Sequence, residues 1–268
     1  MSGLSIVDVS MRFELPDGES VQALQDVSLE IASGELLSVL GPSGCGKSTL
    51  LNILAGFLAP SSGSVALAGR PVTGPGAERG MVFQQGALFE WMNVRDNVGF
   101  GPRMKGMPAA EIDATVDHLL DIVGLRQFKN KAIYELSGGM QQRVALARCL
   151  ANDPDVVLMD EPLGALDALT REKMQGLVLR IWKETGKTIV LITHSVEEAL
   201  LLGERLVVMA PRPGRIHRIF SLPFADLGAG GDLRELKQHP EFRPWREEIL
   251  SMIWEMEEEI MGRTESDS

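Results

Sequence analysis

Residues 36–49, LLSVLGPSGCGKST, join a buried-strand pattern to a phosphate-binding loop. The first five residues form a continuous apolar run, as expected of a parallel strand that is buried on both faces. Gly41, four further residues, and then Gly46, Lys47 and Ser48 match the phosphate-loop pattern. A helical stretch, STLLNILAG, follows, so strand, loop and helix occur in the order that this motif requires. The complete pattern in this context argues against an ordinary glycine-rich turn.

The residue types in this loop suit a nucleotide phosphate chain. Glycines let backbone N–H groups wrap the phosphates, and Lys47 supplies a positive charge near the β- and γ-phosphates. The Ser48 hydroxyl is a hard oxygen ligand for Mg²⁺, and Cys45, at a variable position, is expected to be structural rather than redox-active. The predicted ATP-binding residues of the loop are Gly41, Pro42, Ser43, Gly44, Cys45, Gly46, Lys47, Ser48 and Thr49.

Outward from the loop, short strands alternate with helices, which predicts a parallel, doubly wound sheet. DVVLMD (155–160) and TIVLIT (188–193) read as further buried strands, while the first 84 residues contain strands with one wet face. Residues from about 87 to 154 read as mostly helical. We therefore predict an α/β fold of the P-loop NTPase (RecA-like) type, with an antiparallel β part and an inserted helical subdomain.

The composition excludes several classes of protein. The chain has 268 residues and a net charge of −11, which counts against a general nucleic-acid binder. Two cysteines do not make a disulfide framework. No basic-then-apolar leader opens the sequence and no apolar run reaches membrane-spanning length, so we expect any membrane role to come through a partner.

Polar residues at three strand ends are the candidate catalytic and metal groups. Asp160 and Glu161 follow a buried strand, at the edge where open α/β sheets bind ligands. We expect Asp160 to hold Mg²⁺ through water and Glu161 to orient or deprotonate the attacking water. His194, at the end of another strand, is expected to contact the γ-phosphate. Gln84, a neutral amide that ends MVFQ, is expected to touch Mg²⁺ or water.

A second anion site is predicted at residues 136–143, LSGGMQQR. The apolar residues after the two glycines recur at helical spacing, so the glycines lie where a helix starts and Ser137 is placed to cap it. A glycine-lined helix start exposes N–H groups and the positive end of the helix dipole.

Together these segments resemble the ATP-binding-cassette ATPases. The phosphate loop, Gln84, LSGGMQQR, LMDEP (158–162), GALD (164–167) and His194 occur in that family's order and approximate spacing, over about residues 4–220. The resemblance implies that Ser137, Gly138, Gly139, Gln141 and Asp167 contact ATP bound by a second copy, in a head-to-tail homodimer. Because this second cradle has no lysine, we expect it to bind ATP weakly until the first loop presents the nucleotide.

The resemblance also gives Phe13 the adenine-stacking position, with Val21 as its apolar companion. Two other interpretations remain open, because Phe13 at a strand end can be a core residue and Asp167 can cap the helix that follows it.

Three classes of ATPase compete: a transporter subunit, a cytosolic cassette ATPase of DNA repair or translation, and a small-molecule P-loop kinase. In a kinase, LSGG and His194 would have no role. Repair ATPases usually carry a long coiled coil in the insertion, which is too short here. Translation ATPases usually carry two cassettes in one chain, whereas this sequence has one. The resemblance is greatest to the nitrate/sulfonate/taurine group of importers, above all the taurine importers, through GPGAERGMVFQ (74–84) and APRPGRI (210–216). Glu90, before Trp91, departs from that group, which generally has proline there.

An importer ATPase implies further partners. The apolar stretch after Gln84 includes Phe89 and Trp91, which we expect to contact a transmembrane permease subunit; their packing inside the helical insertion is the alternative. We also expect an indirect partnership with a periplasmic or lipid-anchored solute-binding protein, no nucleic acid, and a peripheral location on the cytoplasmic face of the inner membrane. Residues 221–268 are predicted to be an extension: a glycine-rich linker, a helix after Pro244, and a disordered tail at 264–268.

Overall fold

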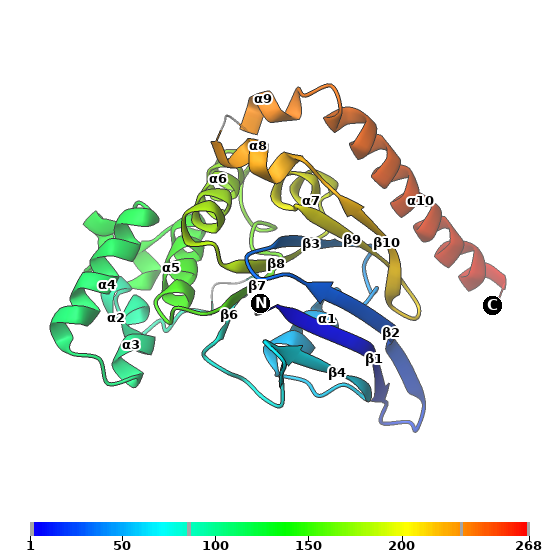
Figure 1. Cartoon of the computed structure of the whole chain (residues 1–268), viewed down its shortest axis with the longest axis horizontal. Helices are drawn as coiled ribbons and strands as arrows, with labels where there is room; N and C mark the ends of the chain where they lie inside the picture. Colours follow the sequence, from blue (N-terminus) through cyan, green and yellow to red (C-terminus); the bar gives the residue numbers. More distant parts are fainter. Residues whose placement is uncertain (1–2, 85–86, 231–232, 267–268) are drawn as a thin grey trace.

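The computed structural model describes residues 3–84, 87–230 and 233–266, and it consists of two β-sheets with helices packed against them (Figure 1). The strands are β1 Leu4–Glu14, β2 Ser20–Ile31, β3 Leu36–Leu40, β4 Ser62–Leu67, β5 Arg70–Pro71, β6 Arg79–Val82, β7 Val156–Asp160, β8 Thr188–Thr193, β9 Arg205–Ala210 and β10 Arg215–Ser221. The helices are α1 Lys47–Ala55, α2 Val94–Val98, α3 Phe100–Met104, α4 Ala109–Ile122, α5 Gly138–Leu150, α6 Ala168–Thr185, α7 Val196–Leu202, α8 Phe224–Gly230, α9 Leu233–Lys237 and α10 Phe242–Ser266.

The larger sheet has six strands in the order β10-β9-β3-β8-β7-β6. All neighbouring pairs are parallel except β10 with β9. All five residues of β3 are buried, as its apolar run predicts, and the strand lies between β8 and β9. The carboxyl ends of the parallel strands therefore meet along one edge, with the end of β3 near the middle.

The smaller sheet is antiparallel, in the order β2-β1-β4-β5. A tight turn joins β1 to β2: Leu15 N donates to Glu19 O at 2.7 Å, and Gly18 has a φ of 87°. Helix α1 lies between the two sheets, because Leu50 and Leu54 share a core with Leu37 of β3 and Leu4 of β1. The predicted α/β class, with an antiparallel part, is confirmed.

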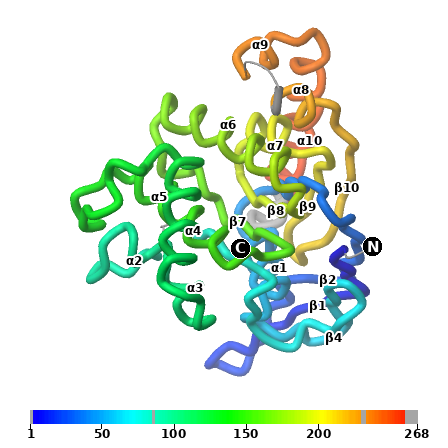
Figure 2. Tube along the Cα trace, turned by 60° about the vertical axis from the view of Figure 1, so that its left-hand side comes forward, coloured from blue at the N-terminus to red at the C-terminus, as the bar shows by residue number. Residues whose placement is uncertain are grey.

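Helices α2 to α5 gather beyond the β6 edge of the larger sheet, at one end of the molecule (Figures 1 and 2). Helix α4 begins directly after Pro108, and α5 begins directly after Ser137, as predicted for the LSGG segment. Gln85 and Gly86, at the expected start of this stretch, lie outside the described residues. The division of the chain into a domain at 4–220, an insertion at about 87–154 and an extension at 221–268 stays a prediction.

The C-terminal part differs from the predicted linker. Helix α8 forms in the glycine-rich segment because Phe224 and Ala225 are fully buried, and the Phe224 ring packs 5.2 Å from that of Phe242. Helix α10 starts at Phe242, before Pro244, since a first-turn residue needs no intrahelical N–H bond. It continues to Ser266, into the segment predicted to be disordered; the last two residues lie outside the described part.

Among the residues that the structure describes, no helix has both the length and the apolar character to cross a membrane.

Candidate active site

The phosphate loop joins the carboxyl end of β3 to α1. Gly46 caps α1 with a left-handed φ of 88°, and a Cβ there would lie 2.5 Å from Cδ2 of Leu24, so this position requires glycine. Lys47, only 7% exposed, donates from Nζ to the carbonyl oxygens of Gly41 at 2.7 Å and Pro42 at 3.1 Å. The lysine is therefore held against the loop that it is predicted to serve.

Asp160 lies beside the loop, and Ser48 Oγ donates to its Oδ1 at 3.3 Å. Partial burial is the main cause of the raised pKa of Asp160, and the Glu161 carboxylate adds to it, while the Ser48 hydrogen bond and the Lys47 charge oppose it. Among the described residues no group of three or more His, Cys, Asp or Glu could hold a metal ion. Two adjacent oxygen donors suit Mg²⁺, which is usually bound through few protein ligands together with phosphates.

Glu161 and His194 meet at the ends of neighbouring strands. His194 Nδ1 lies 3.0 Å from Glu161 Oε2, and the Glu161 backbone N donates to Ile192 O at 3.0 Å. Glu161 has a φ of 42°, an uncommon value for a residue with a side chain, and such strain concentrates at functional sites. The backbone therefore leaves the extended conformation of β7 directly after Asp160.

Gln84 joins this group although it lies two residues beyond the end of β6. A Cβ at Gly164 would be 3.4 Å from Nε2 of Gln84 and 3.7 Å from Cε1 of His194. The Gln84 amide and the His194 imidazole thus approach the same backbone position. Lys47, Ser48, Gln84, Asp160, Glu161 and His194 all come from the carboxyl ends of parallel strands or the segments that follow them, as predicted.

The LSGG segment forms an open helix start. Ser137 Oγ accepts from Met140 N at 3.4 Å, Ser137 and Gly138 are exposed, and no atom would lie within 4 Å of a Cβ at Gly138. The Gln141 amide donates to the carbonyl oxygens of Ile133 at 3.0 Å and Leu136 at 3.3 Å. Within the described parts of the chain, no hydrogen bond joins residues 137–141 to residues 41–49 of the phosphate loop.

Asp167 caps α6, because its carboxylate accepts from Leu169 N at 3.1 Å and Thr170 N at 3.0 Å. The pKa of Asp167 is lowered mainly by a hydrogen bond from the Thr170 side chain and further by those from the Thr170 and Leu169 backbone. The start of α6 also touches the start of α5, since a Cβ at Gly139 would be 2.3 Å from Cγ2 of Thr170. The two helix starts therefore lie side by side.

Phe13 and Val21 face each other across the β1–β2 ladder. Their exposed fractions are 37% and 48%, so Phe13 is not a core residue and the structural interpretation of it is wrong. An exposed aromatic side chain beside an apolar one leaves a surface on which a planar base can stack.

An apolar groove of about 520 Å³ lies between the end of α1 and the helices α3 and α5. Phe89 contributes to it and packs against Phe100, with ring centroids 4.6 Å apart. Trp91 is 5.3 Å from Phe89 and 79% exposed. Three other lining residues come from distant segments and were not predicted: Phe57, Phe83 and Arg148, whose guanidinium lies 5.1 Å from the Phe89 ring centroid.

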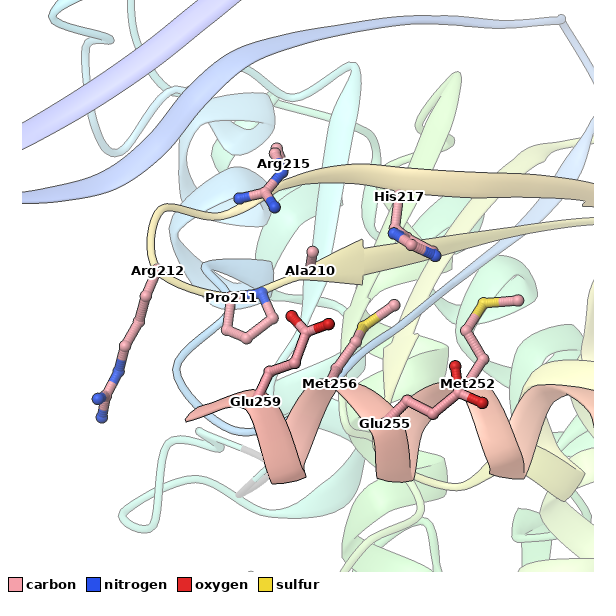
Figure 3. A pocket seen from close by; sticks show the side chains of 9 residues that line it. All are labelled: Ala210, Pro211, Arg212, Arg215, His217, Met252, Glu255, Met256 and Glu259. Carbon is pink, nitrogen blue, oxygen red and sulfur yellow. The ribbon is translucent and has the colours of Figure 1, made fainter. Parts of the chain in front are cut away.

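The turn between β9 and β10 was not predicted to belong to the site, but it packs against the backbone of the phosphate loop. A Cβ at Gly214 would be 2.3 Å from the Cys45 carbonyl oxygen, and Gln25 N donates to Gly214 O at 2.8 Å. A separate hollow of about 260 Å³ lies between this strand pair and α10, from which Met256 and Glu259 extend toward the turn (Figure 3). The C-terminal helix thus faces, across this hollow, the same turn that lies against the phosphate loop.

A phosphate loop, paired carboxylates and a strand-end histidine at one sheet edge define a nucleotide-hydrolysing site of the ATP-binding-cassette class. Residues 24–164 match the family described as ABC transporter. The chain belongs to this family, and it is an ATPase.

The names of similar proteins indicate a narrower function than the family does. The chain is 78% identical to taurine import ATP-binding protein TauB of Roseobacter denitrificans and 76% identical to that of Ruegeria pomeroyi, in each case over 99% of both chains. The protein of the same name from Pelagibacter ubique is 68% identical over 98% of this chain and 99% of its own.

Solved structures agree with the fold. A dimeric post-hydrolysis state of the ATP-binding cassette MJ0796, bound to ADP and Pi, has a TM-score of 0.73 and 34% identity, and the match covers 82% of this chain and 98% of that one. The cbiO1 protein of Clostridium perfringens, described as part of the transporter complex cbiONQ, has a TM-score of 0.73 and 29% identity, covering 89% and 95%.

Proposed function

We propose that the chain is the ATP-hydrolysing subunit of a bacterial importer for taurine, with nitrate and other small sulfonates as rival substrates. The assignment of taurine as the substrate rests on the full-length identity of 78% to a taurine import protein. The sequence of an ATPase subunit does not itself reveal the substrate, because the transported molecule does not touch that subunit. The contact of Glu161 with His194 at the sheet edge supports the hydrolytic role.

Each residue of the site has a proposed task. Lys47 and the backbone of residues 41–49 hold the phosphate chain, with Phe13 and Val21 against the adenine. Ser48, Asp160 and Gln84 hold Mg²⁺, which when bound neutralises phosphate charge. Glu161 accepts a hydrogen bond from the attacking water and orients it, and His194 donates to the γ-phosphate.

A second copy completes the site in this proposal. Ser137, Gly138, Gly139 and Gln141 of one copy face the γ-phosphate held by the other, and Asp167 contacts the other copy beside it. The start of α5 supports this arrangement, because Ser137 and Gly138 are exposed and the first N–H groups of a helix have no partner within the helix. The likeness to a dimeric cassette bound to ADP and Pi also supports it.

The apolar groove is the proposed seat of a permease segment. Phe89 lies in the groove, and Trp91 stands exposed beside it. Gln84 precedes this segment, so a shift at the nucleotide can displace the docked permease. The subunit then works at the cytoplasmic face of the inner membrane, indirectly supplied by a solute-binding protein.

Transport in reconstituted vesicles tests this function. The subunit is assembled with its cognate permease and binding protein, and uptake of labelled taurine, nitrate and a larger sulfonate is compared with ATP inside. Taurine uptake that stops in the Glu161→Gln variant is the expected result. ATP-driven uptake of a different solute, with taurine ignored, would overturn the substrate and leave the ATPase role intact.

A further inference from the structure

A hydrogen-bonded network includes the residues on both sides of His194. None of its members has a task in the proposed ATP hydrolysis. Thr193 Oγ1 donates to Glu198 Oε2 at 2.7 Å and accepts from Ser195 N at 3.0 Å. Both side chains are buried, with exposed fractions of 1% for Thr193 and 4% for Glu198. The Glu198 carboxylate on α7 therefore holds Thr193, and the Thr193 hydroxyl in turn holds the backbone of Ser195, so the residues on both sides of His194 belong to one network.

The same carboxylate reaches the other loop of the site. Glu198 Oε1 lies 3.6 Å from Nε of Arg171 on α6. Arg171 donates to the carbonyl oxygens of Leu166 at 2.8 Å and Leu163 at 3.4 Å, so its guanidinium holds the segment between Glu161 and Asp167. Its backbone N donates to Asp167 O at 2.8 Å.

The two partners of this ion pair differ in burial: the Glu198 side chain is 5% exposed and that of Arg171 is 39% exposed. Burial is the main cause of the raised pKa of Glu198, and the Thr193 hydrogen bond and the Arg171 charge oppose that rise. Water screens the pair on the arginine side, but separation leaves the buried carboxylate without its cation, which favours movement of the two side chains together.

We propose that Arg171 and Glu198 are positioning residues that join the loop carrying Asp167 to the loop carrying His194. The consequence rests on the proposed homodimer: when a second copy displaces Asp167, the displacement reaches the imidazole through Arg171, Glu198 and Thr193. The γ-phosphate contact then forms only when the partner is seated. Neither positioning residue touches the nucleotide.

Histidine NMR of the isolated full-length subunit tests the link without a permease or a substrate. The chain has four histidines, and the Glu161-facing one is assigned by its loss in His194→Gln. Asp167→Ala removes the cap of α6 and should shift the His194 ring resonances. In a Glu198→Gln background, the same Asp167 change should leave them in place.

Glu197 supplies the matched control. It is the neighbouring glutamate on α7, but its carboxylate pairs with Arg246 at 3.3 Å and Lys237 at 3.7 Å, away from Arg171. Glu197→Gln should therefore leave the response of His194 to Asp167→Ala intact. A His194 response that survives in Glu198→Gln, or is lost equally in Glu197→Gln, overturns the proposal.

Kinetics of ATP hydrolysis give a second readout. Glu198→Gln should lower kcat about fivefold to tenfold, within the range of coupling networks, with the KM for ATP changed less than about twofold. Arg171→Gln combined with Glu198→Gln should be no slower than the worse single variant, because both remove the same link. Independent, multiplying effects would contradict the link.

A conservative substitution at Arg171 tests the link even if one of the glutamine variants fails to fold. Arg171→Lys keeps a cation and the helix but loses the planar fork, and it should retain more kcat than Arg171→Gln at similar thermal stability. Equal kcat in the two Arg171 variants would overturn the link. An importer that ignores taurine, by contrast, would change the proposed function and leave these outcomes unaffected.

Discussion

His194 Nδ1 lies 3.0 Å from Glu161 Oε2, although the two residues are 33 positions apart in the sequence. Parallel pairing of β7 with β8 brings them together, since the backbone of Glu161 hydrogen-bonds to Ile192 at the end of β8. One carboxylate oxygen is thereby paired with the ring, and the other remains available to water. This division of work gives the first prediction.

Glu161→Gln should lower kcat for ATP hydrolysis by about a hundredfold or more, the usual effect of losing a general base. The amide keeps the shape and a contact with His194 but cannot polarise water. ATP affinity should stay within about twofold, and an ATP-bound dimer should accumulate in size-exclusion chromatography. Near-normal turnover of this variant in the assembled transporter would remove Glu161 from the mechanism.

Lys47→Ala should weaken ATP binding about tenfold or more, because a charge-assisted contact is lost. The loop should keep its connection to α1, because Gly46 still caps the helix, although the hydrogen bonds from Lys47 to the carbonyl oxygens of Gly41 and Pro42 are lost. Isothermal titration calorimetry of the isolated subunit measures this effect. Unchanged affinity would contradict the assignment of the phosphate loop.

Gly138→Asp should prevent ATP-driven dimerisation while each monomer still binds ATP. A carboxylate would stand where the proposed partner's γ-phosphate lies, and like charges repel. Gly139 is unsuitable for this test, since any Cβ there would collide with Thr170. Gly138→Ala, at a position with open space, is the control. Dimerisation of the aspartate variant with ATP would refute the role in trans.

Trp91→Ala should reduce solute uptake by the assembled transporter severalfold, with little change in the ATP affinity of the isolated subunit. The side chain is 79% exposed, so the fold does not depend on it, and exposed tryptophans are typical anchors of interfaces. Trp254→Ala on α10, with 60% exposure, is the matched control. Normal uptake in vesicles by the Trp91 variant would exclude this surface as the permease contact.

Asp160→Asn should raise the melting temperature of the nucleotide-free subunit at pH 7 by a few degrees, about 2–4 °C for each kcal/mol. Partial burial raises the pKa of Asp160, so the folded state binds its proton more tightly than the unfolded chain, and ionisation destabilises the fold.

The destabilisation by Asp160 develops as the pH rises from the ordinary aspartate pKa of about 3.9 to the raised value, and it is constant above that. The gain from asparagine should therefore shrink as the pH is lowered toward that range. Thermal unfolding at pH 7 and at lower pH measures this, with exposed Asp155→Asn as the control. A gain that is the same at every pH would contradict the assigned cause.

Sequence reasoning succeeded where the determinants are local. The apolar run of β3, the glycine at residue 46 and the cap at Ser137 act on their own neighbours, so their elements could be predicted. It failed for β10, whose RIHRIFS pattern is mostly polar because the strand lies at a sheet edge with its charged side chains exposed.

Contacts across the sequence were harder to foresee. Nothing near Arg171 in the sequence indicates that its partner is Glu198, since only the packing of α6 against α7 brings them together. Helix α8 was missed because burial of Phe224 outweighs the unfavourable local propensity of its glycines.

The steric collision of a Cβ at Gly139 with Thr170 limits which substitutions this sequence can accept. The nearest obstacle, at 2.3 Å, is Cγ2 of Thr170, while the next atoms, Cδ2 of Leu166 and Cβ of Thr170, lie at 3.7 Å. Serine at position 170 removes that one methyl group and leaves only ordinary contacts. Positions 139 and 170 therefore constrain each other: alanine at position 139 requires Thr170 to shift, whereas serine at position 170 makes room for it without a collision between α5 and α6.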